Sequence, residues 1–277
     1  TRFNDRITGD LNEFAPKAKI VHIDVDTAAI SRNVVVDVPI VSDANLALEK
    51  LLEWAESKDT AAWQAQIAGW DEKNPLEMRR DHGMTPQMIF EHVNRTFGEA
   101  VYVTDVGQHQ MWATQYLELD SWHQLITSGG LGTMGFGLPA AIGAKIGNPD
   151  KEVVCFSGDG GLQMNIQEMA TAAENQLDVK IILMNNEALG LVHQQQSLFY
   201  KQGVFAATYP GMINFMQIAA GFGLHTCDLN AEEDAHAALQ AAISRPGPAL
   251  IHVRIDPEQK VYPMVPPGAA NTEMVGE

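Results

Sequence analysis

The chain has 277 residues, and its 35 acidic against 18 basic side chains give a formal net charge of −17. Nucleic acid and anionic membranes both need a basic face, so we expect neither as a partner. No apolar run approaches the roughly 18 residues of a membrane-spanning helix. Two cysteines leave no room for a disulfide framework, so a cytoplasmic protein is expected. The first residues form no signal peptide and include no initiator Met, which predicts a start within a longer protein.

The first 55 residues have the sequence pattern of the C-terminal end of an α/β domain. Lys19–Asp26 and Val34–Val41 are β-rich and predict strands. Ser42-Asp43 is a capping pair, and leucines at helical spacing follow it. We therefore expect the end of a domain over residues 1–55, and a polar helical connector over residues 56–83.

From residue 84 the pattern repeats strand, loop and helix. Strands are predicted over Val101–Val106, Val153–Ser157, Val179–Met184 and His252–Ile255. Helices are predicted from Thr85-Pro86 onward, and over Leu138–Ile146, Asn165–Asn175 and Ala231–Ile243. This alternation predicts an α/β fold, with a parallel sheet covered by helices on both faces. We expect that domain over residues 84–262, followed by an irregular tail over residues 263–277.

Two turns at strand ends carry the sharpest signal. One is GDGG at residues 158–161, and the other is the Asn pair at residues 185–186. Carboxyl ends of parallel strands share one edge of a sheet, where ligands bind. Asp159 and Asn186 would offer oxygens to Mg²⁺, and the glycine N–H groups would favour a diphosphate. The alternative is a helix-capping aspartate and an asparagine pair in a turn.

Gly158-Asp159-Gly160, then 24 residues, then Asn185-Asn186 resembles the cofactor motif of thiamine-diphosphate-dependent enzymes. Residues 107–113 (GQHQMWA) and 128–135 (SGGLGTMG) are similar to acetohydroxyacid synthase (acetolactate synthase) catalytic subunits, most closely the bacterial isozyme I type. Residues 2–6 (RFNDR) resemble an Arg-Phe-Asp-Asp-Arg motif of that family, with Asn4 as a departure. The resemblance implies the C-terminal half of such a subunit, comprising the end of a Rossmann-like FAD-binding domain and the thiamine-diphosphate-binding domain.

The resemblance also implies how thiamine diphosphate and Mg²⁺ are held. The three expected metal ligands are the side chains of Asp159 and Asn186 and the main-chain carbonyl of Ala188. Met134 would lie under the cofactor and bend it, and Gly132 would accept a hydrogen bond from its aminopyrimidine ring. The residues expected to contact the diphosphate are Gln108, His109, Gly160 and Gly161.

A second cofactor is implied for the first part of the chain. The family binds FAD without using it for redox chemistry in the main reaction. The expected contacts are Asp24, Val25, Asp43 and Ala44. An acid at the end of a strand is typical of a nucleotide-binding unit. The alternative for Asp24 is a solvated strand-end charge.

The implied activity joins pyruvate to a second 2-keto acid with loss of CO₂, in branched-chain amino acid biosynthesis. Pyruvate would give 2-acetolactate, and 2-ketobutyrate would give 2-aceto-2-hydroxybutyrate. Gln195 stands where most relatives have a Trp, which predicts a weak preference for 2-ketobutyrate. The alternative is that Gln195 points away from the substrate pocket.

The family forms homodimers or larger assemblies with active sites between subunits, and it implies a small regulatory subunit. A glutamate from the N-terminal half activates the cofactor in the family. Nothing in this chain matches its motif, so the chain alone is expected to be inactive.

Two other functions remain open from the residues. One is a different thiamine-diphosphate enzyme, such as pyruvate oxidase, glyoxylate carboligase or a 2-keto acid decarboxylase. The other is a non-catalytic nucleotide-binding module. Gly130-x-Gly132-x-x-Gly135 also matches the dinucleotide-binding fingerprint, although a lone match is weak.

Overall fold

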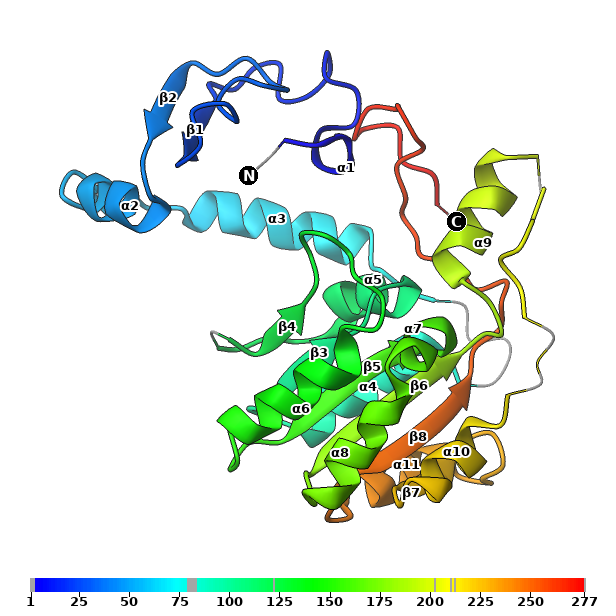
Figure 1. Cartoon of the computed structure of the whole chain (residues 1–277). Helices are drawn as coiled ribbons and strands as arrows, with labels where there is room; N and C mark the ends of the chain where they lie inside the picture. The colour runs from blue at the N-terminus through cyan, green and yellow to red at the C-terminus, as the bar shows by residue number, and fades with distance from the viewer. Residues whose placement is uncertain are drawn as a thin grey trace. The chain divides into compact units, whose positions relative to one another are not determined.

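The chain divides into two compact units in its computed structural model (Figure 1). The structure describes residues 3–78, 84–121, 123–201, 203–209, 211 and 213–276. The first unit is Thr1–Pro75 together with Tyr262–Glu277, and the second is Leu76–Val261. The tail expected over residues 263–277 therefore groups with the first unit. One of its contacts is a 3.0 Å hydrogen bond from Asn271 Nδ2 to the carbonyl of Ile7.

The first unit is built around two short parallel strands, β1 (Val21–Asp24) and β2 (Val38–Val41). Both are shorter than their predicted ranges. Its helices are α1 (Asp5–Thr8), α2 (Ala44–Leu52) and α3 (Ala61–Lys73). Asp43 caps α2 as predicted, but the α2 leucines are exposed and Ala47 is its one buried residue. Helix α3 lies in the expected connector, whose residues 79–83 are outside the described part.

The second unit contains a six-stranded sheet in which every pairing is parallel (Figure 1). The order of its strands is β4-β3-β5-β6-β8-β7. Central β5 and β6 are almost wholly buried, as expected of strands covered on both faces. The bounds are β3 (Val101–Thr104), β4 (Leu125–Thr127), β5 (Val153–Gly158), β6 (Val179–Asn185), β7 (His225–Asp228) and β8 (Ala249–Arg254).

Helices cover both faces of this sheet (Figure 1). One buried cluster is formed with α4, α5 and α11, and the other with α6, α8 and α10. The predicted fold class, a parallel sheet flanked by helices, is confirmed. No helix in the described ranges is both long and apolar enough to span a membrane. The bounds are α4 (Pro86–Thr96), α5 (Gln108–Tyr116), α6 (Gly137–Gly147), α7 (Asp159–Met164), 3₁₀ helix η1 (Ile166–Glu168), α8 (Met169–Glu174), α9 (Gly190–Phe199), α10 (Phe215–Gly221) and α11 (Ala235–Ser244).

The strand order changes direction between β3 and β5. From β3 the chain goes to β4 on one side, and it then returns to β5 on the other side. Ligands of open α/β sheets bind outside the carboxyl ends of the strands at such a switch point. The topology therefore predicts a ligand site at the turns that follow β3, β5 and β6.

Candidate active site

Three turns meet at the switch point of the sheet. Residues 105–109 follow β3, residues 159–161 follow β5, and residues 186–190 follow β6. The His109 ring lies about 3.1 Å from where a Cβ on Gly158 would be. A Cβ on Gly190 would clash with the side chains of Gln108 and Asn186. The structure thus brings together residues that are far apart in the sequence.

Asp159 is the buried acid of this edge. Its Oδ1 accepts a 2.8 Å hydrogen bond from Gly160 N–H, while its Oδ2 is buried and accepts no hydrogen bond from a described residue. Burial raises the pKa of Asp159 to about 6, and the main-chain N–H groups of Gly160, Ala188 and Glu187 offset part of this rise. A buried carboxylate oxygen without a donor is costly unless a cation compensates it.

The turn after β6 is fixed from both sides. Asn186 Oδ1 accepts from Ala188 N–H at 3.2 Å, and Asn186 Nδ2 donates to Gln108 Oε1 at 3.1 Å. Glu187 has a left-handed φ of +54°, and its carbonyl accepts from Tyr209 N–H. Leu189 N–H donates to the carbonyl of Ala207, and Ala188 forms an isolated antiparallel β-bridge with Thr208, so the turn is paired with a second main-chain segment. The turn that carries Asn186 and Ala188 is therefore held in one defined shape, and its N–H groups at Glu187 and Ala188 lie close to the Asp159 carboxylate.

His109 is the buried base of this edge. Burial lowers its pKa to about 4, although Asp105 opposes the shift, so the imidazole is neutral at physiological pH. Its Nε2 is buried without a partner among the described residues. A Cβ on Gly107 would overlap with this ring at 2.9 Å, and a Cβ on Gly158 would make a tight contact with it at 3.1 Å. A neutral imidazole at this edge is suited to a hydrogen bond with a phosphate oxygen.

The loop before α6 brings Met134 to the same edge. Its Cε lies 3.4 Å from the position of a Cβ on Gly160. Gly132 has a left-handed φ of +68°, and its N–H donates to the carbonyl of Ser128 at 3.0 Å. Glycine adopts this conformation without the cost that a side chain would add. The two loop residues expected at the cofactor are thus placed by a turn that glycine allows.

Asp105 organises that loop, and sequence reasoning did not single it out. It is 1% exposed, and its carboxylate accepts from the N–H groups of Val106, Gly135 and Gly137 at 2.7, 3.0 and 2.8 Å. The N–H groups at the start of α6 are therefore already bonded to an acid of the chain. A dinucleotide fingerprint needs those groups for a pyrophosphate, so this geometry disfavours the dinucleotide interpretation. Its position at the end of a predicted strand was the signal that could have found Asp105.

We expect Asp105→Ala to destabilise the second unit by roughly 3–5 kcal/mol, because it leaves the buried N–H groups of Gly135 and Gly137 and the partly buried N–H group of Val106 without their charged acceptor. Urea unfolding of the variant measures this loss. Asp150→Ala removes an exposed acid near the start of β5 and should change the unfolding free energy by about 0.5 kcal/mol or less. Equal stability of the two variants would contradict the structural role of Asp105.

The four residues expected at FAD lie at one edge of the small sheet of the first unit. Asp24 ends β1 and pairs in register with Val41, directly before the turn to Asp43. Asp43 accepts from the N–H groups of Asn45 and Leu46, and Ala44 is the first residue of α2. Val25 is exposed. The structure thus gathers these residues at one edge of the small sheet, where Asp43 also caps α2.

Gln195 lies half-buried on α9. Its two neighbours on that helix have side chains bonded to main-chain groups elsewhere, Gln194 to Val261 and Gln196 to Phe205. The role of Gln195 in substrate choice stays a prediction.

Gln108 was expected to contact the diphosphate. Its side chain is hydrogen-bonded to Gln194, Gln259 and Asn186, so the first turn of α5 would offer main-chain N–H groups to the diphosphate in place of this side chain.

Residues 105–253, which contain all three turns, match the family described as "Thiamine pyrophosphate enzyme, C-terminal TPP binding domain". The chain belongs to the thiamine pyrophosphate enzymes. Residues 1–51 match the central domain of the same enzymes. The predicted family resemblance is thereby confirmed.

Large subunits of acetolactate synthase are among the similar proteins. Isozyme 1 of Escherichia coli (strain K12) is 60% identical over the whole of this chain and 50% of its own length. Isozyme 2 of the same strain is 40% identical over 99% of this chain and 50% of its own length. The chloroplastic acetolactate synthase 1 of Nicotiana tabacum is 41% identical over the whole chain and 44% of its own length. The chain thus spans about half the length of these relatives.

The site of this thiamine pyrophosphate enzyme fits a hydrated divalent cation with a diphosphate. Across the described residues no three His, Cys, Asp or Glu side chains cluster where they could hold a metal. The available ligands are instead one carboxylate, one carboxamide and main-chain carbonyls. Mg²⁺ is commonly bound by only a few protein oxygens, because phosphate and water oxygens complete its octahedral coordination. The unpaired Oδ2 of Asp159 is the atom that such an ion would satisfy.

Proposed function

We propose that the chain is the C-terminal part of an acetolactate synthase catalytic subunit. The intact enzyme would condense pyruvate with a second 2-keto acid, releasing CO₂, at the first common step of branched-chain amino acid biosynthesis. The observation that carries the proposal is the buried, unpaired Asp159 oxygen beside the Asn186 turn, at the switch point of the sheet. The similarity to acetolactate synthase large subunits supports the choice of reaction.

Asp159, Asn186 and the Ala188 carbonyl would hold Mg²⁺. His109 and the main chain of residues 160–161 would contact the diphosphate, and Met134 and Gly132 would shape and orient the thiamine end. Thiamine diphosphate, when bound, would supply the nucleophilic carbon and the electron sink that loss of CO₂ needs. The chain's own residues orient the cofactor and neutralise its charge, which is the share that proteins contribute in such reactions.

The first unit would contribute to an FAD site through Asp24, Val25, Asp43 and Ala44. Their shared position at the end of two parallel strands and the start of a helix supports a nucleotide site. We further propose a homodimer or larger assembly, a small regulatory subunit and a cytoplasmic location. The word "large subunit" in the names of the relatives supports a second, smaller subunit.

A product assay separates this function from other thiamine-dependent reactions. The full-length protein, supplied with pyruvate, thiamine diphosphate, Mg²⁺ and FAD, should form acetolactate. Acetyl phosphate would indicate an oxidase, and acetaldehyde would indicate a decarboxylase. Absence of any cofactor-dependent product would favour a non-catalytic module.

Substrate choice is expected to depend on Gln195. A Trp here would add apolar surface for the extra methyl of 2-ketobutyrate, and one buried methylene is worth about 0.8 kcal/mol. Pocket discrimination by one methylene reaches about 1–3 kcal/mol. With both keto acids present, Gln195→Trp should shift product toward acetohydroxybutyrate by up to about tenfold.

The control is Gln195→Asn, which keeps a short polar carboxamide and should leave the product ratio unchanged. The measurement is a competition assay on full-length enzyme with both products quantified. A wild type that already strongly favours 2-ketobutyrate, or a Trp variant that shifts nothing, would remove Gln195 from substrate selection.

A further inference from the structure

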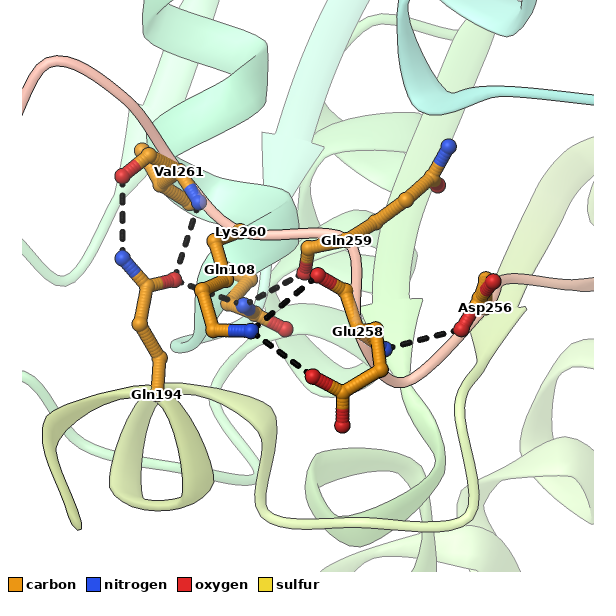
Figure 2. Close-up of polar contacts among 7 residues, drawn as sticks. All are labelled: Gln108, Gln194, Asp256, Glu258, Gln259, Lys260 and Val261. Atoms are coloured by element: carbon orange, nitrogen blue, oxygen red, sulfur yellow. Dashed lines mark hydrogen bonds and ion pairs between the residues drawn. The ribbon is translucent and has the colours of Figure 1, made fainter. Parts of the chain in front are cut away.

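A series of hydrogen-bonded carboxamides connects the main chain at Val261 with the candidate metal ligand Asn186. Figure 2 shows its first part, from Val261 through Gln194 to Gln108. Val261 N–H donates to Gln194 Oε1 at 2.9 Å, and Gln194 Nε2 donates to the Val261 carbonyl at 2.9 Å. A peptide group cannot exchange its donor and acceptor, whereas a Gln carboxamide can turn over. The Val261 peptide therefore determines which end of the fully buried Gln194 side chain is oxygen.

The orientation of the Gln194 carboxamide in turn determines that of Gln108. Gln194 Oε1 accepts from Gln108 Nε2 at 2.8 Å, and the same Nε2 donates to the carbonyl of Gln259 at 3.1 Å. With its nitrogen held by two acceptors, Gln108 turns its Oε1 toward Asn186. That oxygen accepts from Asn186 Nδ2 at 3.1 Å.

The last link orients the metal ligand itself. Because Asn186 Nδ2 faces Gln108, Asn186 Oδ1 faces the opposite side, where it accepts from Ala188 N–H. A flipped carboxamide would present N–H groups to a cation, which repel it and offer no lone pair. The orientation seen here is the one that coordination through Oδ1 requires.

Val261, where this series of hydrogen bonds begins, is held in place by its surroundings. Val261 is fully buried, and the segment before it is braced by local contacts (Figure 2). Lys260 Nζ bonds the carboxylate of Glu258 at 2.9 Å, and Glu258 N–H donates to Asp256 Oδ1 at 2.9 Å. A segment fixed in this way keeps the N–H and C=O groups of Val261 in constant positions, so the carboxamides that follow keep one orientation.

We propose that Gln194 is a positioning residue that, through Gln108, fixes the carboxamide of Asn186 with its oxygen toward the divalent cation. The inference rests on the proposed function, because it takes Asn186 as a metal ligand. Partners that orient metal ligands from behind typically contribute 10–100-fold to metal affinity. The effect of Gln194 should therefore appear in cation binding, separately from turnover.

The test uses full-length protein in the presence of excess thiamine diphosphate, into which Mg²⁺ is titrated calorimetrically, with a protein-free titration subtracted. Gln194→Met has a similar volume but no polar end, so Gln108 Nε2 keeps only the Gln259 carbonyl as acceptor and orients Asn186 less firmly. We expect its Mg²⁺ affinity to fall about 10–100-fold. Gln196→Met is the matched control, because Gln196 lies on the same helix and clamps the main chain of Phe205 in the same way, without a link to Asn186. Equal Mg²⁺ affinity in the two variants would overturn the proposal.

A double-mutant cycle separates orientation from general support of the fold. Asn186→Asp carries a carboxylate, which presents an oxygen whichever way it turns and so needs no orientation. In that background Gln194→Met should cost little Mg²⁺ affinity, and less than threefold is expected on the additivity scale for independent effects. The same loss in both backgrounds would mean that Gln194 acts only on the fold.

If Gln194→Met fails to fold, Gln194→Glu replaces it. A Glu still offers an oxygen to Gln108 and Val261, so Mg²⁺ affinity should stay within about threefold of wild type even where unfolding becomes easier. A loss of tenfold or more in this variant would overturn the proposal. Failure of the proposed function has a different signature, since wild-type protein would then show no Mg²⁺-dependent binding of thiamine diphosphate.

Discussion

Asp159→Ala is expected to weaken Mg²⁺-dependent binding of thiamine diphosphate by roughly two to three orders of magnitude. Asp159 is the only carboxylate among the proposed ligands, so its loss leaves the charge of the metal and diphosphate without a protein counter-charge. A unit charge pair about 4 Å apart contributes about 4 kcal/mol at an effective dielectric constant of 20. Each 1.4 kcal/mol corresponds to about a tenfold change in affinity. Calorimetry on the full-length variant measures the change.

Folding of this variant can be checked independently. Because burial raises the pKa of Asp159 to about 6, above its ordinary value, ionisation of this acid lowers stability as the pH rises through that value. Asp159→Ala removes this cost, so the metal-free variant should unfold at the same or higher urea concentration as wild type at neutral pH. Glu152→Ala, at the opposite end of the sheet, should change neither property. Unchanged Mg²⁺ dependence in Asp159→Ala would remove it from the metal site.

The 277-residue chain by itself is expected to form no acetolactate. Its proposed cofactor contacts hold the metal, the diphosphate and one side of the thiamine. The resemblance implies that the acid that would activate the cofactor lies in the N-terminal half of such enzymes, and this chain spans only about half the length of its relatives. A half-built site can bind a diphosphate weakly, but it does not preorganise the reacting groups, which is where most of the acceleration arises.

Acetolactate formation by the purified chain and by full-length protein, each saturated with cofactors, tests this expectation. The purified chain should give less than about a hundredth of the full-length rate, given that a positioned proton-transfer group contributes roughly 10²–10⁴-fold. Calorimetry with thiamine diphosphate should still detect weak binding that Asp159→Ala abolishes. A rate near that of full-length protein would place the whole catalytic machinery within these residues.

The central sheet was predictable because burial on both faces leaves an uninterrupted apolar run. Val153–Ser157 and Val179–Met184 have that pattern, and they became β5 and β6 with ends shifted by one residue. The edge strands β4 and β7 have no such pattern, since one is three residues long and the other is mostly polar. β4 and β7 form strands because adjacent strands pair with them, and a single sequence does not show which strands will be adjacent.

The site was predictable where a motif lies at a strand end. Asp159 and Asn186 were found in this way, and the structure places them on the same edge of the sheet. Gln194 has no such position, and Asp105 lies at a strand end but outside any motif. The role of each depends on groups that only the fold brings close. The bonds of Asp105 to Gly135 and Gly137 span 30 and 32 residues, and the bond of Gln194 to Val261 spans 67. No periodicity in the sequence marks contacts of that range.

The most direct test of the proposed site is crystallography of the full-length protein with thiamine diphosphate and Mn²⁺ in place of Mg²⁺. Mn²⁺ prefers the same oxygen ligands, and anomalous scattering locates it independently of the protein atoms. We predict one manganese peak per chain, within bonding distance of Asp159, Asn186 Oδ1 and the Ala188 carbonyl and next to the diphosphate. A manganese peak elsewhere, or a diphosphate bound away from the carboxyl ends of β3, β5 and β6, would contradict the account.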